Sequence, residues 1–376
     1  MFEIEASEGN AKAGILTTAH GKIETPFFMP VATKGAVKQI SSHDLKQLEI
    51  DAVISNSFIM YLKPGLELLE KLGGIHKFMS YDKTIFTDSG GFQMLSQRFL
   101  KKINDKGVTF NSPFDGKDYF LTPEDVMDIE DKVGSDVSMV LDHVNKYGDS
   151  YETFRDTLLR TMRWAERCKA HHDKNCSSKQ LLFGIVQGGL FRDLKEISIR
   201  HANSLDFDGI AIGGLAFGEP RKEMFDILDH SMRFIDRKKP VYLMGVGEPT
   251  DLLESVARGV DCFDSRFPTM NARHGTLMTS KGRILIKNKE FRNDERPIDE
   301  ECGCFVCKNY SKSYIHHMLR FNEAVGLRLA SYHNLYFIRQ LMKDMRTAIV
   351  EGRFEKFRSD FKKRYNSPER GEFLYK

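Results

Sequence analysis

The sequence predicts a (β/α)8 barrel, because eight short apolar runs alternate with helical patterns along most of its 376 residues. The runs have the length of strands and are rich in Val, Ile, Phe and Leu. They lack strict alternation of apolar and polar residues, as expected of strands buried on both faces. Between the runs, residues 152–172 and 219–234 have helical periodicity. The predicted strands are residues 27–33, 51–56, 84–88, 136–142, 181–187, 209–214, 240–245 and 260–264.

Five of the eight runs end in a carboxylate or amide side chain. These residues are Asn56, Asp88, Asp142, Gln187 and Asp264. In a (β/α)8 barrel the carboxyl ends of the strands meet on one face, and the active sites of this fold lie there. Asp and Asn also end strands simply as turn formers, which explains one such residue more readily than five. We therefore expect these side chains to line one site.

Two segments of the chain are additional to a minimal (β/α)8 barrel. Residues 94–134 contain a predicted hairpin around Asp115-Gly116 and then a helix start, with Thr122 as N-cap and Pro123 at the first position. From residue 273 on, a second hairpin, a cysteine cluster and a long amphipathic stretch follow. We expect residues 1–272 to form the barrel with an N-terminal extension, and residues 273–376 to form an appended subdomain with basic C-terminal helices.

Composition narrows the class of protein. No run approaches the roughly 18 apolar residues of a membrane span, and the first residues lack the basic and apolar regions of a signal peptide. We therefore expect a cytoplasmic protein with no membrane partner. The net charge of +3 does not by itself indicate a nucleic-acid-binding protein, but residues 339–376 contain eleven Lys or Arg against six Asp or Glu, so the basic character is local.

Three of the six cysteines crowd into six positions, Cys302, Cys304 and Cys307, which is a poor layout for disulfides. With one imidazole they would complete a tetrahedral Cys3His zinc shell, which leaves no position open for substrate and is therefore structural. By spacing alone, His316 and His317 compete with His333 for the fourth place. The alternative interpretation is three buried free thiols.

Two carboxylates at strand ends predict chemistry. Asp88 precedes Ser89-Gly90-Gly91, whose glycines let the backbone approach a ligand closely, and Asp264 is the last residue of the eighth run. Facing each other, they would suit a nucleophile paired with a general acid/base, as in retaining glycosyl transfer. Alone, these motifs indicate a barrel glycosidase or lyase.

In combination with other motifs, the sequence resembles the tRNA-guanine transglycosylase (queuine tRNA-ribosyltransferase) family over nearly its whole length. The matching motifs, in the family's order, are TPFFMPV (25–31), DSGGFQ (88–93), GIVQGG (184–189), IGGL (212–215), YLMGVG (242–247) and CxCxxC (302–307) with His333. The resemblance implies an irregular (β/α)8 TIM barrel with a C-terminal zinc-binding subdomain. It also implies His333 as the fourth ligand of one structural zinc ion, a homodimer, and no redox or nucleotide cofactor.

The implied reaction exchanges a guanine in tRNAs with a GUN anticodon for a 7-deazaguanine through a covalent aspartyl intermediate. By resemblance, Asp264 is the nucleophile that attacks the target ribose and Asp88 is the general acid/base. Asp142, Gln187 and the backbone of Gly214 match positions that read the guanine-like edge of the base. The other expected substrate-binding residues are Met244 and Phe92, which would sandwich the ring, Leu215 and Glu219 near the 7-substituent, Val144 beside Asp142, and Asn56.

Several positions depart from the usual bacterial pattern. Val144 stands where bacterial members commonly have Cys and is more typical of eukaryotic enzymes that take queuine, whereas the bulk of Phe217 should shrink the pocket. Arg266 and Met270 replace an apolar residue and an Arg, respectively. We expect queuine to be favoured over 7-aminomethyl-7-deazaguanine.

Two other functions stay open from the sequence. A non-catalytic tRNA-binding subunit of a heterodimer would need neither Asp88 nor Asp264, and a DNA-modifying relative is excluded less firmly. Phosphate contacts are expected on cations of the C-terminal part. These are Arg273, Lys281, Arg283, Lys287, Lys289, Arg292, Lys362, Lys363 and Arg364.

Overall fold

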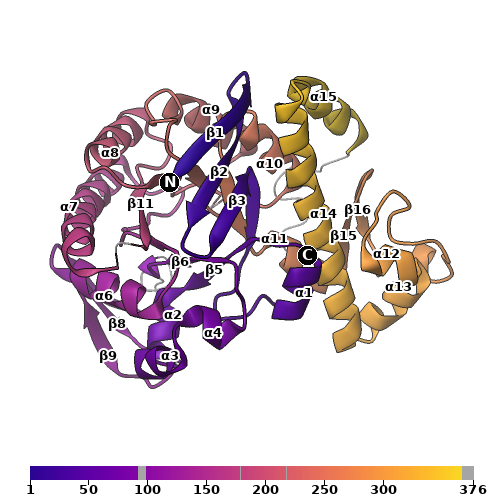
Figure 1. The fold of residues 1–376 in the computed structure, drawn as a ribbon, viewed down its shortest axis with the longest axis horizontal. Helices are drawn as coiled ribbons and strands as arrows, with labels where there is room; N and C mark the ends of the chain where they lie inside the picture. The colour runs from indigo at the N-terminus through magenta and orange to yellow at the C-terminus, as the bar shows by residue number, and fades with distance from the viewer. Residues whose placement is uncertain (92–98, 178, 217, 366–376) are drawn as a thin grey trace.

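The computed structural model describes residues 1–91, 99–177, 179–216 and 218–365. Eight parallel strands form a barrel (Figure 1). Their order around it is β4 (Phe27–Pro30), β14 (Cys262–Ser265), β13 (Val241–Leu243), β12 (Gly209–Ile212), β11 (Leu181–Val186), β10 (Val137–Met139), β6 (Thr84–Asp88) and β5 (Ala52–Asn56). A parallel bridge between Val31 and Ile54 closes the ring between β4 and β5. The predicted (β/α)8 fold is confirmed.

The barrel interior is packed with aromatic side chains. The Phe86 ring lies 6.1 Å from that of Phe27, 5.7 Å from that of Phe183 and 6.3 Å from that of Tyr242, measured between centroids. Phe86, Phe183 and Tyr242 are fully buried. Because this core leaves no pore, ligands can reach the strands only at the rim, where the carboxyl ends of β5, β6 and β14 place Asn56, Asp88 and Asp264.

Helices surround the barrel (Figure 1). They are α1 (Ser42–Gln47), α2 (Ser57–Leu62), α3 (Leu66–Leu72), α4 (Ile75–Met79), α6 (Pro123–Val133), α7 (Tyr151–Asn175), α8 (Arg192–Ser204), α9 (Arg221–Ser231), α10 (Pro249–Val256) and α11 (Phe267–His274). Two of them match predicted helices closely, α7 over 152–172 and α9 over 219–234. Helix α9 begins later than predicted because Glu219 accepts a hydrogen bond from the N–H of Ala216 at 2.5 Å and stays outside the helix.

The predicted insertion is a sheet rather than a lone hairpin. Strands β8 (Gly107–Asn111) and β9 (Asp118–Leu121) form the expected hairpin, and β7 (Leu100–Asn104) adds a third antiparallel strand. Thr122 caps α6 as predicted, because its hydroxyl accepts from the N–H of Asp125 at 3.1 Å. The N-terminal extension is also a three-stranded antiparallel sheet, of β1 (Phe2–Glu8), β2 (Ala11–Thr18) and β3 (Gly21–Thr25), for which no strands were predicted.

The C-terminal elements lie along one side of the barrel (Figure 1). They are β15 (Thr276–Thr279), β16 (Gly282–Leu285), the 3-10 helix η1 (Lys289–Phe291), α12 (Phe305–Asn309), α13 (Lys312–Arg320), α14 (Ala324–Val350) and α15 (Phe354–Arg364). Arg346 of α14 donates to the carbonyls of Gly14 and Thr25 at 3.0 and 2.9 Å, which ties this helix to the N-terminal sheet. Within the described residues, no helix has the length and apolar character needed to cross a membrane.

Candidate active site and metal centre

Asp88 is the last residue of β6, and one of its carboxylate oxygens accepts hydrogen bonds from two donors. Its Oδ1 accepts from the amide of Asn56 and from the N–H of Gly90 at 2.9 Å. Gly90 has φ of +78°, and a Cβ there would lie 2.2 Å from the Cβ of Phe58, so this turn requires glycine. No described residue bonds to Asp88 Oδ2, which is therefore free to hold a proton or meet a ligand.

Asp264, at the end of β14, has the same arrangement. Its Oδ1 accepts from the hydroxyl of Tyr242 at 2.6 Å and from the N–H of Gly245 at 2.9 Å. No described residue bonds to its Oδ2. The carboxylate is therefore fixed in direction while one oxygen stays available as a nucleophile.

The two carboxyl groups differ in their electrostatic surroundings. The pKa of Asp88 is raised to about 8, mainly by burial and also by the nearby carboxylates of Asp264 and Asp142, while the bonds from Gly90 and Asn56 oppose the rise. Burial also raises the pKa of Asp264, but Tyr242, Gly245 and the positive charge of Arg266 lower it. Asp88 is therefore protonated at neutral pH, as a general acid must be.

Asp142 and Gln187 meet beside this pair. The Nε2 of Gln187 donates to Asp142 Oδ2 at 2.5 Å, whereas the buried Oε1 of Gln187 has no hydrogen-bond partner among the described residues. Burial raises the pKa of Asp142 to about 6, against the bond from Gln187, so Asp142 is mostly ionised at neutral pH. Gly214 has φ of +71°, and a Cβ there would lie 2.6 Å from Gln187 Oε1. These three residues therefore form one polar wall.

Two buried ionisable side chains, those of Lys195 and Glu219, form hydrogen bonds to the segment that follows β12. The Nζ of Lys195 donates to the carbonyl of Gly213 at 3.2 Å, and burial lowers the pKa of this lysine to about 7, partly offset by the charge of Glu219. The Glu219 carboxylate in turn accepts from the N–H of Ala216 at 2.5 Å. Both side chains thus hold the backbone on either side of Gly214 and Leu215.

The remaining predicted site residues fall into two groups. Leu215 is buried, and Met244 and Val144 are half-buried. Phe92 and Phe217 lie outside the described residues. Sequence reasoning missed Tyr242 and the backbone of Gly245, although both belong to the matched YLMGVG motif, and it gave no role to Arg266, whose charge lowers the pKa of Asp264.

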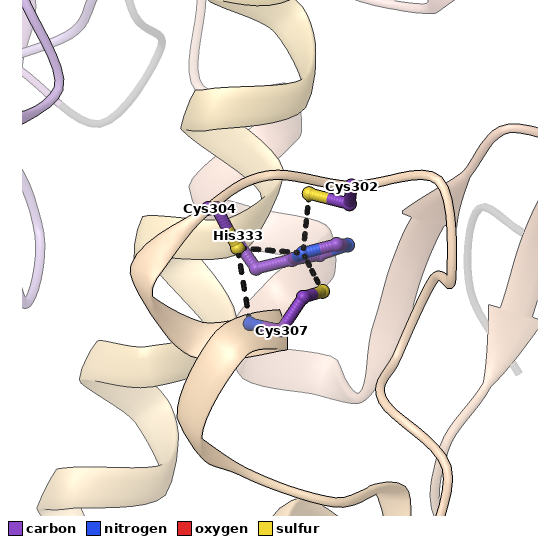
Figure 2. A group of neighbouring side chains, drawn as sticks. All are labelled: Cys302, Cys304, Cys307 and His333. Atoms are coloured by element: carbon purple, nitrogen blue, oxygen red, sulfur yellow. Dashed lines mark hydrogen bonds between the residues drawn. The ribbon is translucent and has the colours of Figure 1, made fainter.

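The four predicted metal ligands converge in the C-terminal part. The sulfurs of Cys302, Cys304 and Cys307 lie 3.8, 3.5 and 3.4 Å from Nδ1 of His333 (Figure 2). Zinc–sulfur and zinc–nitrogen distances of about 2.3 and 2.0 Å in a tetrahedron give a sulfur–nitrogen separation of about 3.5 Å. The residues therefore fit a tetrahedral metal ion.

The surroundings of the histidines identify the fourth ligand. Nε2 of His333 lies 2.7 Å from the carbonyl of Met278, which directs the Nδ1 lone pair toward the thiols. His316 bonds instead to the carbonyl of Ile286 at 2.8 Å, and the ring of His317 contacts Phe321. Of the three open candidates, only His333 belongs to the cluster.

Comparison with known proteins identifies the family. The model of the family described as queuine tRNA-ribosyltransferase matches residues 7–367. Similar proteins carry that same name: one from Fusobacterium nucleatum is 47% identical over 97% of this chain and 98% of its own length. One from Thermoanaerobacter is 46% identical over 96% of both chains, and one from Bacillus licheniformis is 46% identical over 94% of this chain and 93% of its own.

The chain belongs to the queuine tRNA-ribosyltransferase family. The resemblance inferred from the sequence motifs is thereby confirmed, and so is the predicted enzyme class, a pentosyltransferase. The queuine tRNA-ribosyltransferase match, over residues 7–367, includes both the barrel strands and the cysteine cluster.

Proposed function

We propose that the protein exchanges the wobble guanine of tRNAs with a GUN anticodon for a 7-deazaguanine by double displacement. The observation that carries this proposal is the matched pair of carboxyl groups at the barrel rim. In Asp88 and in Asp264, one oxygen is held by two donors and the other has no bond to a described residue. Such a pair supplies a positioned acid and a positioned nucleophile.

In the first displacement, Asp264 Oδ2 attacks the anomeric carbon of the target ribose. The bond to guanine breaks, and the proton of Asp88 passes to the departing base, which leaves a ribosyl ester on Asp264. In the second, the incoming base gives its proton to Asp88, attacks the same carbon and releases the Asp264 carboxylate. Two inversions retain the configuration. Because no water is needed, the site must exclude it.

Recognition of the base follows from the polar wall. The ring N–H and exocyclic amine of a guanine-like base are donors suited to Asp142, which is mostly ionised at neutral pH. These two donors of the base would replace the Gln187 N–H as partners of the Asp142 carboxylate. The Gln187 amide and the backbone N–H of Gly214 could then both donate to the carbonyl oxygen of the base. Met244 and Phe92 would cover the ring faces, and Leu215 and Glu219 would adjoin the 7-substituent.

We further propose that the metal is a structural zinc ion, that the protein acts in the cytoplasm, and that it is a homodimer. Of the cations predicted to contact phosphate, Lys362 and Arg364 pair with Glu254 and Glu301 at 3.0 and 3.5 Å. Exposed cations without an ion pair to a described residue are better suited to phosphate, and these are Lys281, Lys289, Arg292 and Lys363.

The pH dependence of the reaction tests the role of Asp88. Since the first step needs protonated Asp88, kcat/KM should fall as pH rises through about 8. In Asn56→Ser, serine can still cap α2 but is too short to donate to Asp88, so the ionised form loses a donor and the pKa rises. The alkaline limb should move to higher pH. If the pH–rate profile of the variant overlays that of the wild type, Asp88 does not carry the titrating proton.

The incoming base is tested by comparing kcat/KM for queuine and 7-aminomethyl-7-deazaguanine on one unmodified tRNA. We expect queuine to be favoured, and Val144→Cys to reduce the preference. One or two apolar contacts discriminate by roughly 10- to 200-fold at most, so both bases should react. If the wild type clearly prefers the aminomethyl base, Phe217 rather than Val144 sets the pocket.

The nucleic acid is tested with labelled guanine offered together with either tRNA or duplex DNA. Incorporation into tRNA alone supports the proposal. Incorporation into DNA would point to a DNA-modifying relative. Binding of tRNA without any incorporation would point to a non-catalytic subunit.

A further inference from the structure

A second group of metal-ligating side chains lies at the opposite end of the barrel from the candidate active site. His20 in the turn between β2 and β3, His76 of α4, and Asp136, which directly precedes β10, come from three separate segments. His20 Nδ1 lies 2.8 Å from Asp136 Oδ1, and His76 Nε2 lies 2.9 Å from Asp136 Oδ2. The potential ligand atoms of the three residues all lie within 4.8 Å of one another.

The carboxylate of Asp136 is buried with an exposed fraction of 1%. Its contacts with positively ionisable groups are those with His20 and His76, and no described lysine or arginine pairs with it. Its oxygens also accept from the backbone N–H groups of His20 and Ile85, at 3.0 and 2.9 Å. Because a buried carboxylate is generally paired with a cation or bound to a metal, the site is electrostatically suited to a positive ion.

The two imidazole rings are stacked face to face, and both contact that carboxylate. Their centroids are 3.6 Å apart and their planes differ by 17°. Each ring directs one nitrogen to a different oxygen of Asp136, so both nitrogens face the same small volume. His76 is buried, whereas the His20 side chain is 41% exposed, which gives an ion a route from solvent.

We propose that His20, His76 and Asp136 form a second metal site, for a divalent transition-metal ion such as Zn²⁺ or Co²⁺. Two imidazoles and a carboxylate are the ligand set that such ions accept, with water completing the coordination. To bind the ion, Nδ1 of His20 and Nε2 of His76 must each present a lone pair. A neutral ring then carries its proton on the nitrogen that does not face the ion, and a doubly protonated ring first releases one proton to water.

The bound ion would link the N-terminal sheet to the base of the barrel. At present Thr18 of β2 bonds to Thr84 of β6 at 2.8 Å in the same region. A metal bound by residues 20, 76 and 136 would join segments far apart in the sequence and stabilise the folded state by mass action. Since the candidate active site lies at the carboxyl ends of the strands, the ion should change stability and leave base exchange unaltered.

The test uses the full-length protein as purified, with its cysteine cluster loaded. After equilibrium dialysis against Zn²⁺ or Co²⁺, the wild type should hold one metal equivalent per chain more than His20→Gln or His76→Gln. The matched control is His43→Gln, since His43 is an exposed histidine of α1 and should retain the wild-type content. Added Zn²⁺ should raise the Tm of the wild type and of His43→Gln but not of His20→Gln.

Cobalt separates the two sites, because thiolate-bound Co²⁺ absorbs strongly in the near ultraviolet and a nitrogen- and oxygen-bound ion does not. The extra equivalent should therefore add no thiolate absorption. Equal metal content in the wild type and in both folded His variants would overturn the proposal. So would a wild type whose extra cobalt is thiolate-bound. Circular dichroism and unchanged base exchange establish that a variant is folded.

Discussion

Asp264→Asn is expected to reduce kcat/KM for base exchange by at least about 1,000-fold, because the amide keeps the size of the side chain but cannot form the ribosyl ester. The hydroxyl of Tyr242 and the N–H of Gly245 can still bond to the amide oxygen, so the local structure should persist. Incorporation of labelled guanine into tRNA measures the loss.

Two controls separate chemistry from binding. The affinity of Asp264→Asn for tRNA should be close to that of the wild type, because phosphate contacts on exposed cations supply most of it. Tyr242→Phe keeps the nucleophile and removes one donor to it, worth roughly 1.5–3 kcal/mol or about 10- to 160-fold. If kcat/KM of Asp264→Asn is as high as that of Tyr242→Phe, nucleophilic attack by Asp264 is ruled out.

Cys304→Ser is expected to remove the metal and to lower the Tm by roughly 10 °C or more, since structural zinc binding is worth on the order of 10 kcal/mol in small domains. Cys304 is buried between α12 and α14, and its sulfur also accepts from the N–H of Cys307 at 3.3 Å. Loss of the Cys304 thiol therefore removes one of the four metal ligands and also a hydrogen bond that stabilises the turn at the start of α12.

Metal analysis and thermal unfolding measure both effects. Cys176→Ser is the matched control, because Cys176 is a half-buried free cysteine outside the cluster, and it should keep the wild-type metal content. A metal-free Cys304→Ser protein with the stability of the wild type would show that the cluster has no structural role.

The barrel could be predicted from the sequence because buried parallel strands have a local signature. Most of the strands are predominantly apolar, and a polar residue near the carboxyl end marks the rim, so Asp88 was predicted at the last position of β6 and Asp264 one residue before the end of β14. The N-terminal sheet was missed because β1 contains no continuous apolar run: its Phe2, Ile4 and Ala6 alternate with polar residues, and the strand is mostly exposed. The antiparallel partners that stabilise it are non-local.

The finer features of the site depend on contacts between distant segments. Nothing in the spacing of Tyr242 and Asp264 shows that the hydroxyl bonds to the carboxylate, since that contact requires β13 and β14 to pair. The choice among His316, His317 and His333 was open for the same reason. It is decided by the fold, which places β15 against α14 and gives His333 the carbonyl of Met278.

The most direct test of the double-displacement mechanism is to trap the covalent intermediate. The protein is mixed with unmodified tRNA, quenched under denaturing conditions and separated on a denaturing gel. The wild type should give a protein–RNA band that disappears when excess incoming base is added before the quench, and Asp264→Asn should give none. An undiminished adduct in Asp264→Asn would contradict the assignment of Asp264 as the nucleophile.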